Sequence, residues 1–192
     1  MGYAKRSFAI AAAANATVFT GAGGLFGIVL KENTGVAAAG TLTVYDNTAA
    51  SGSILATVRL GADGELAQPL LWAKGVKFGT GLTVAAAGAD LTGTLLIGSA
   101  GGLRALPFAG ADLLLLTGAR NLDSILAAET AGAVAEWRMY DALSATGTPF
   151  AGASPAANET MKIDFGAAGV QIDTGLFYDQ QGGASSGAAY VF

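Results

Sequence analysis

Residues 41–58 of the chain read TLTVYDNTAASGSILATV, and this stretch decides the fold. Leu42 and Val44 alternate with side chains that would point the other way, and a period of two is typical of a half-buried β-strand. Between Asp46 and Gly52 lie turn-forming side chains and a glycine that accepts positive φ without steric cost. The apolar alternation resumes after the turn. The stretch therefore predicts a β-hairpin with a loop of about six residues, longer than a two-residue turn.

The hairpin and its surroundings recur further along the chain, at offsets of about 94 to 97 residues. Glycine and alanine contribute to any such self-similarity in this chain, but the Tyr-Asp pair and the Val-x-x-x-Thr-Gly-Leu pattern do not depend on them. A period this long indicates two tandem domains, because solenoid repeats run about 20–50 residues. The matches are Tyr45-Asp46 with Tyr140-Asp141, residues 51–53 with residues 146–148, residues 75–82 (GVKFGTGL) with residues 169–176 (GVQIDTGL), and residues 18–22 (VFTGA) with residues 115–119 (LLTGA).

Short apolar runs separated by turn signals every eight to twelve residues are typical of β-sandwiches and barrels. The sequence therefore predicts an all-β fold of two tandem, duplicated antiparallel β-sandwich domains of jelly-roll-like type. The first domain is expected over residues 1–98, with an N-terminal arm over residues 1–20. Residues 99–102 (SAGG) are the expected linker, and residues 103–192 form the second domain, a copy of the first.

Three segments of the second domain carry weaker signals. Residues 122–128 are apolar and too short for periodicity to separate a helix from a strand. Residues 148–160 contain Pro149 and Pro155 and predict an irregular loop. Residues 180–187 are polar and glycine-rich and predict a flexible loop.

Composition narrows the function more than any motif does. The 192 residues include no cysteine and no histidine, which excludes disulfides, thiolate or imidazole metal sites, and catalysis by either side chain. Charged residues make up 12% against an average near 25%, and hydrophobic residues make up 52%. No run approaches the ~20 apolar residues of a membrane-spanning helix. We therefore expect apolar surface that is covered by oligomerisation or by a larger assembly. The alternative is that alanine supplies most of the apolar count and burdens the surface little.

The net charge of −4 is shared unevenly. Residues 1–98 carry six Lys/Arg and five Asp/Glu (+1), whereas residues 99–192 carry four and nine (−5). Nucleic-acid binding would require a basic stripe, which this distribution does not supply. We expect neither nucleic acid nor membrane as a partner.

Carboxylates are the most plentiful reactive groups. Asp164, Asp173 and Asp179 are close in sequence and could form a paired-carboxylate glycosidase site, but solvated turn residues explain them equally. Asp46-Asn47 or Asp63 could bind Ca²⁺ through oxygen, yet no Asp-x-Asp-x-Asp-Gly run is present and turn formation is the simpler interpretation.

The remaining motifs are weaker still. Residues 21–24 and 98–102 are glycine-rich but lack the following Lys-Ser/Thr of a phosphate-binding loop. Asn15 and Asn158 begin glycosylation-acceptor patterns, which are short enough to occur by chance. Five aromatic residues could line a sugar-binding face or, more commonly for aromatics on strands, a core; they are Trp72, Trp137, Tyr45, Tyr140 and Tyr178. The sequence thus predicts a protein that is not an enzyme, with no catalytic, cofactor-binding or metal-binding residue and no cofactor.

Residues 41–58 together with residues 81–98 (GLTVAAAGADLTGTLLIG) resemble small structural proteins of tailed bacteriophages, namely head decoration (cement) proteins and short tail proteins of β-sandwich type. The resemblance covers about half of the first domain, and the proline-containing loop of the second domain departs from it. It implies a virion protein without enzymatic activity, located on the capsid exterior. It further implies a homo-oligomer, a trimer by preference, bound to the major capsid protein.

Under this hypothesis residues 1–20 and the less acidic first domain face the capsid, and deletion of residues 2–17 abolishes particle binding while leaving the fold intact. The alternatives are a structural protein of the phage tail, neck or fibre, and a carbohydrate-binding adhesin module.

Overall fold

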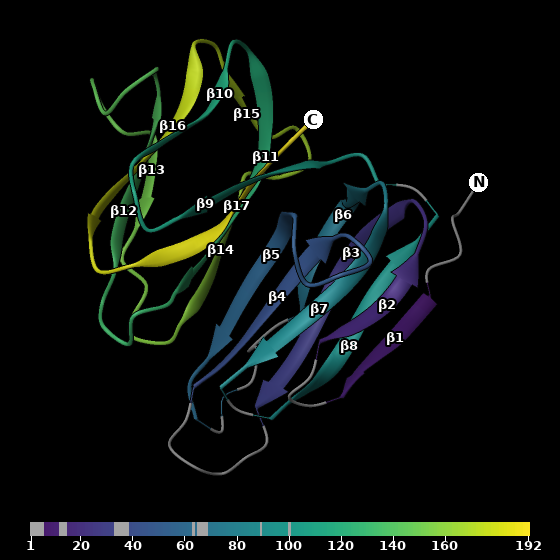
Figure 1. Ribbon diagram of the computed structural model, residues 1–192. Helices are drawn as coiled ribbons and strands as arrows, with labels where there is room; N and C mark the ends of the chain where they lie inside the picture. The colour runs from purple at the N-terminus through teal and green to yellow at the C-terminus, as the bar shows by residue number, and fades with distance from the viewer. Residues whose placement is uncertain are drawn as a thin grey trace. The chain divides into compact units, whose positions relative to one another are not determined.

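The structure is a computed structural model that describes residues 6–11, 15–32, 39–62, 64, 69–88, 90–99 and 101–192. These residues form strands β1 to β17 in four antiparallel sheets, with no helix among them, which confirms the all-β sandwich-like fold class (Figure 1). The chain divides into two compact units, residues 1–105 (unit 1) and residues 106–192 (unit 2). The division falls a few residues after the linker expected at residues 99–102.

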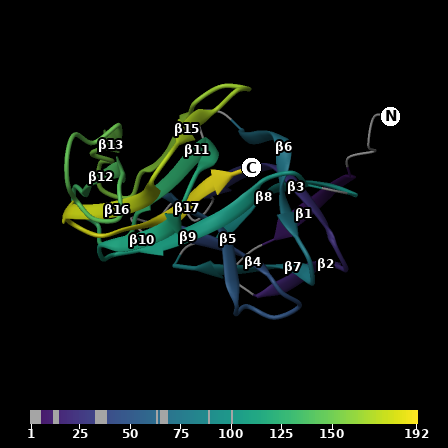
Figure 2. The ribbon, with the colours of Figure 1, turned by 90° about the horizontal axis from the view of Figure 1, so that it is seen from above.

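Unit 1 is a sandwich of two four-stranded sheets with the orders β1-β8-β3-β6 and β2-β7-β4-β5. The two layers are separated clearly in Figure 2. Alternating apolar side chains of both sheets, such as Leu25, Leu42 and Leu95, are fully buried between them. The strands are β1 (Arg6–Ala11), β2 (Ala16–Thr20), β3 (Gly23–Glu32), β4 (Gly40–Asp46), β5 (Ser53–Leu60), β6 (Leu70–Phe78), β7 (Gly81–Ala87) and β8 (Leu91–Gly98).

Unit 2 is a second sandwich, with the sheet orders β10-β16-β12-β13 and β14-β11-β17-β9. Its core is aromatic: the rings of Phe108 and Tyr178 stack at 4.3 Å, and Trp137 lies 6.5 Å from Tyr178. The strands are β9 (Arg104–Ala109), β10 (Leu113–Thr117), β11 (Arg120–Glu129), β12 (Glu136–Asp141), β13 (Ala151–Ala153), β14 (Thr160–Asp164), β15 (Val170–Ile172), β16 (Gly175–Gly182) and β17 (Ser185–Val191).

The two units share one strand order. When β9, β10, β11 and β12 are matched in turn with β1, β2, β3 and β4, each sheet of unit 2 has the order of its counterpart in unit 1. The single strand β6 corresponds to β14 and β15, which pair with successive parts of β11. A shared order is what a duplicated domain would produce; the duplication itself stays a prediction.

The hairpin of residues 41–58 forms as expected. Strands β4 and β5 pair from Gly40 opposite Leu60 to Asp46 opposite Ser53. In the turn the Asn47 amide donates to the Ser51 carbonyl at 3.1 Å, and Gly52 has φ 91°. Asparagine and glycine therefore act here as turn residues do in general.

The expected N-terminal arm is wrong for the residues that the structure describes. Strand β1 pairs with β8, and β2 pairs with β7, so both sheets take an edge strand from this segment. The rings of Phe8 and Phe19 lie 6.1 Å apart and Ile10 is buried. Alternating large apolar residues explain why the segment joins the core. Deleting residues 2–17 would remove an edge strand, so it cannot leave the fold intact. Residues 1–5 and 12–14 lie outside the described residues.

Other local predictions differ from the structure in similar ways. The backbone N–H of Gly102 donates to the Lys74 carbonyl at 2.8 Å and that of Leu103 to Gly75 at 2.9 Å, so the end of the expected linker is fastened to β6. Ala100 lies outside the described residues. The segment of residues 122–128 belongs to strand β11, and the loop of residues 148–160 contains strand β13.

The flexible loop expected over residues 180–187 is instead a tight hairpin between β16 and β17, with Gly183 at φ 64°. The amide of Gln180 donates to the Glu136 carbonyl at 2.9 Å, and its oxygen accepts a hydrogen bond from the Ser185 hydroxyl at 2.9 Å. Polar side chains bind neighbouring strands here, which a composition-based reading of a polar segment as loop does not anticipate.

Candidate functional site

The repeated Tyr-Asp pair has one structural role in both units. In unit 1, the carboxylate of Asp46, the last residue of β4, accepts hydrogen bonds from the backbone N–H of Gly79 (2.9 and 3.0 Å) and Thr80 (2.9 Å). These two residues form the turn between β6 and β7. The aspartate therefore fastens the end of the hairpin to a turn more than thirty residues away.

Unit 2 repeats this arrangement. The Asp141 carboxylate accepts hydrogen bonds from the N–H groups of Asp173 (2.9 Å), Thr174 (2.7 Å) and Gly175 (3.2 Å). Burial alone would raise the pKa of Asp141, but these three donors favour the ionised form and bring the pKa below its ordinary value. The two repeated sequence motifs, Tyr-Asp and x-Thr-Gly-Leu, are therefore two halves of one contact.

Asp141→Ala should lower the free energy of unfolding of unit 2 by about 1–2 kcal/mol, because three backbone donors lose a charged acceptor. The pKa of Asp141 is lowered in the folded state, so its contribution is fully present above the unfolded pKa near ~3.9 and is lost as pH falls through the lower folded value. Urea unfolding at neutral pH and at low pH checks both statements. Asp173→Ala is the matched control, since that exposed carboxylate accepts from the Gln171 side chain. An equal effect of both variants would contradict the assignment.

A second matched pair of carboxylates escaped the sequence interpretation. Glu32 and Glu129 are the last residues of the equivalent strands β3 and β11, and both are 0% exposed. Their backbone N–H groups make equivalent bonds, to Gly64 and to Glu159 respectively, both at 2.8 Å. The signal in the sequence is Ile-x-x-x-Glu-x-x-Gly, which begins at Ile28 and again 97 residues later.

The Glu129 carboxylate is surrounded by backbone donors. It accepts hydrogen bonds from the N–H groups of Ala131, Gly132 (2.9 Å) and Asn158 (2.8 Å), the last from a residue at φ 61°. Burial raises the pKa of Glu129, but the backbone donors, to which Ala133 also contributes, outweigh it and lower the pKa. A general acid at neutral pH needs a carboxyl whose pKa is raised. The clear carboxyl shifts, at Glu129 and Asp141, go the other way and suit permanent acceptors.

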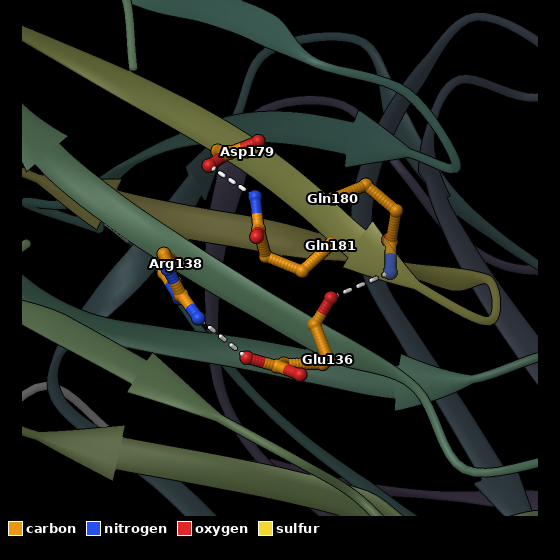
Figure 3. Close-up of polar contacts among 5 residues, drawn as sticks. All are labelled: Glu136, Arg138, Asp179, Gln180 and Gln181. Atoms are coloured by element: carbon orange, nitrogen blue, oxygen red, sulfur yellow. Dashed lines mark hydrogen bonds and ion pairs between the residues drawn. The ribbon is translucent and has the colours of Figure 1, made fainter. Parts of the chain in front are cut away.

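Strands β12 and β16 carry a group of polar side chains that bind one another or the neighbouring backbone (Figure 3). We define this polar cluster as Glu136, Arg138, Asp179, Gln180 and Gln181. Arg138 pairs with Glu136 at 2.9 Å, and the Gln181 amide donates to Asp179 at 2.6 Å. Hydrogen bonds to Glu136 and Tyr140 raise the pKa of Arg138 and keep it a cation.

The Arg138–Asp179 pair of the cluster is not repeated in the equivalent strands of unit 1, which are fully described. Arg138 lies opposite Asp179 across β12 and β16, whereas the equivalent strands β4 and β7 place Thr43 opposite Ala85. Beside the cluster lies an open pocket of about 400 Å³, lined by Glu136, Arg138 and residues 149–154. No pattern in the sequence pointed to this cluster, because Asp179 is more than forty positions from Glu136 and Arg138.

The three aspartates proposed for glycosidase chemistry are not gathered into one site. Asp164 lies on β14, where it pairs with Lys162 at 2.8 Å, whereas Asp179 lies on β16 in the other sheet of unit 2. Asp173 lies in the turn held by Asp141. Asp164 and Asp173 are exposed, as solvated turn residues would be, whereas Asp179 is 5% exposed within β16 and accepts a hydrogen bond from the Gln181 amide.

The proposed calcium ligands are also engaged elsewhere. Both Asp46 oxygens accept backbone N–H groups, and the Asn47 oxygen accepts from Thr48 N–H at 2.8 Å. Asp63 lies outside the described residues. Across the part of the chain that the structure describes, no group of three or more acidic residues could hold a metal ion.

The aromatic residues considered for sugar binding lie mostly inside the sandwiches. Trp72 and Trp137 are 1% exposed and Tyr178 is 0% exposed, while Tyr140 is buried and Tyr45 half-buried. Tyr178 bonds Gln180 and, at 2.6 Å, the Ser185 hydroxyl; burial, the largest cause, raises the pKa of this tyrosine to about 12. Trp72, Trp137 and Tyr178 are therefore core residues.

Of the two glycosylation patterns, Asn15 is exposed just before β2, and Asn158 sits in the turn that donates to Glu129. In the glycine-rich segments, the Gly21 N–H donates to the Thr80 carbonyl at 3.0 Å and residues 101–102 approach β6 closely. The described glycines of both segments therefore make backbone contacts within unit 1.

Comparison with protein-family models, with curated proteins and with solved structures gave no match. Within the described ranges no helix is long and apolar enough to cross a membrane. The fold and the contacts define the class of the chain: an all-β protein of two sandwich units, each with a buried glutamate at the end of a central strand and an aspartate that binds a turn.

Proposed function

We propose that the chain is a non-enzymatic virion structural protein that decorates and stabilises a bacteriophage capsid by docking on its outer shell as an oligomer. The observation that carries the proposal is the use of the repeated carboxylates. The groups best able to do chemistry, Asp46, Asp141 and Glu129, are bound to backbone N–H groups. Both units use an aspartate for the same structural contact, and a chain whose carboxylates serve its own backbone suits a component of a viral shell.

Exposed apolar side chains supply a docking surface. On the outer face of the sheet β1-β8-β3-β6, a Cβ on Gly27 would lie 2.8 Å from Leu71 and 3.1 Å from Leu96, so these two leucines flank the glycine on that face. Val29, two residues on, points the same way and is 42% exposed; Leu71 is 52% exposed. We name Gly27, Val29, Leu71 and Leu96 the unit 1 apolar face. Its partner is the major capsid protein.

Charge supports this orientation: residues 1–98 carry a net charge of +1, and residues 99–192, with −5, would face solvent. Gly27 is itself buried, because Leu71 and Leu96 lie over it, so the exposed apolar side chains around it would make the contact. The surface replaces the N-terminal arm as the expected docking element, because the described part of that arm is built into the sheets.

The test is co-sedimentation of the purified chain with empty shells assembled from the major capsid protein of the phage that encodes it. The native chain should pellet with shells, and Leu71→Lys should lower the bound fraction at least about tenfold, because a lysine would be desolvated in an apolar contact. Val134→Lys, at a 63% exposed position of unit 2, should bind as the native chain does. A native chain that stays in the supernatant would overturn the proposed function, and normal binding by Leu71→Lys would overturn the docking face.

The alternatives predict other outcomes. Binding to tails or necks but not to shells would favour a tail, neck or fibre component. A carbohydrate-binding module would need aromatic rings presented to solvent, and both tryptophans are 1% exposed.

A further inference from the structure

The structure describes every residue of unit 2. The edge strands of this unit differ in how well they are protected against pairing with another chain. Edge strands are usually shielded by charge, by proline or by shortness. Strand β9 contains Arg104 and Pro107, β14 carries the Lys162–Asp164 ion pair, and β13 and β15 have three residues each. Strand β10, the remaining edge, reads LLLLT: it carries neither charge nor proline, and its protection against pairing is limited to a register irregularity within the strand.

The leucines of β10 fall into two groups. A register irregularity between Leu114 and Leu116 directs Leu115 and Leu116 toward the core of unit 2. Leu113 and Leu114 remain 43% and 39% exposed. Leu143 extends this apolar surface and is 54% exposed. Its side chain lies against Gly175, which pairs with Thr117 at the end of β10.

We propose that β10 pairs with β10 of a second copy of this chain, antiparallel and across a two-fold axis. Such an interface is isologous, since both copies present the same strand and the same leucines. It would join two four-stranded sheets into one and satisfy the outward-facing backbone groups of both edges. Leu113, Leu114 and Leu143 of each copy would be covered.

The charges that flank β10 fit this occupant. Asp112 directly precedes the strand and Arg120 follows it by three residues; both are exposed. In an antiparallel pair, Asp112 of one copy lies beside residues 118–120 of the second copy. The axis therefore creates two symmetric contacts between opposite charges and places no like charges together at the strand ends. A parallel arrangement would bring like charges together and is disfavoured.

Sedimentation equilibrium of the isolated chain tests the interface without any capsid. The native chain should have about twice its 18.9 kDa mass, where the decoration-protein resemblance implies a trimer. Leu114→Lys should raise the dimer dissociation constant at least about 100-fold, because it buries a charge at the seam. Leu71→Lys, an identical substitution at an exposed leucine of unit 1, should stay dimeric. A monomeric native chain, or a native mass that Leu114→Lys does not change, would overturn the proposal.

A second variant tests the same interface if the Leu114→Lys chain does not fold. Because the chain has no cysteine, Leu114→Cys introduces a single thiol. The antiparallel register that sets Asp112 beside residues 118–120 offsets the two thiols along the strands beyond the reach of a disulfide, so a short bis-maleimide is used. It should link two copies of Leu114→Cys, whereas Leu71→Cys should stay unlinked. Equal linking of both variants, or of neither, would also overturn the proposal. The two proposals can be contradicted independently. Leu71→Lys should weaken binding to shells and leave the dimer unchanged, whereas Leu114→Lys should weaken the dimer.

Discussion

Gly187→Ala should prevent unit 2 from reaching its native fold. Gly187 lies in β17 opposite Ala127 of the central strand β11, and a Cβ there would lie 1.9 Å from the Leu126 carbonyl oxygen. The contact is with backbone, so relief requires the two strands to separate. We expect a loss of more than about 4 kcal/mol, a large part of the stability of a domain of this size.

The two tryptophans allow each unit to be followed alone. Trp72 lies in unit 1 and Trp137 in unit 2, and both are buried. In a Trp72→Phe background, the emission of Trp137 should report exposure to water in Gly187→Ala at neutral pH without denaturant. Gly182→Ala is the control, because a Cβ at that position meets nothing within 4 Å and should change stability by less than about 0.5 kcal/mol. Native Trp137 emission in Gly187→Ala would refute the close approach of β17 to β11.

The same close approach occurs in unit 1. A Cβ on Gly93 would lie 2.0 Å from the Val29 carbonyl oxygen, on the strands that correspond to β17 and β11. Gly93→Ala should therefore disrupt unit 1 as Gly187→Ala disrupts unit 2. In a Trp137→Phe background the signal comes from Trp72.

Glu129→Ala should cost unit 2 about 2–4 kcal/mol. The substitution removes a buried carboxylate that accepts the N–H groups of Ala131, Gly132 and Asn158, and hydrogen bonds to a charged acceptor contribute more than neutral ones. Urea unfolding followed by Trp137 emission measures the loss. Glu136→Ala is the matched control: its carboxylate is 48% exposed in a surface ion pair, and we expect less than about 1 kcal/mol.

The pH dependence gives a second test of Glu129. Its pKa is lowered on folding, so the ionised side chain stabilises the fold fully above the unfolded pKa near ~4.3, and the stabilisation disappears as pH falls through the lower folded value. The native chain should therefore lose more stability on acidification than Glu129→Ala does. Parallel acid profiles for the two chains would contradict the burial and bonding of this carboxylate.

Local patterns in the sequence were sufficient for the fold class. The period of two around Leu42 and Val44 identified the hairpin, and the repeated Tyr-Asp pair identified equivalent places in two similar units. What that pair does could not be predicted, because the contact joins Asp46 to a turn more than thirty residues away. Sequence spacing carries no information on which donors a carboxylate will meet.

The errors came from reading composition as conformation. The N-terminal segment looked like an arm because alanines surround Phe8 and Ile10, yet these apolar side chains suffice to add edge strands. Gln180 and its neighbours looked like a loop because they are polar, yet their hydrogen bonds lie between strands. Glu129 was overlooked because a single glutamate in an alanine-rich run gives no sign of burial.

The most direct test of the proposed function is cryo-electron microscopy of intact particles of the phage that encodes this chain. We expect density for two β-sandwich units on the outer surface of the capsid, with the unit 1 apolar face (Gly27, Val29, Leu71 and Leu96) against the major capsid protein. Density confined to the neck or tail, or no density for the chain in any part of the particle, would contradict the proposed function.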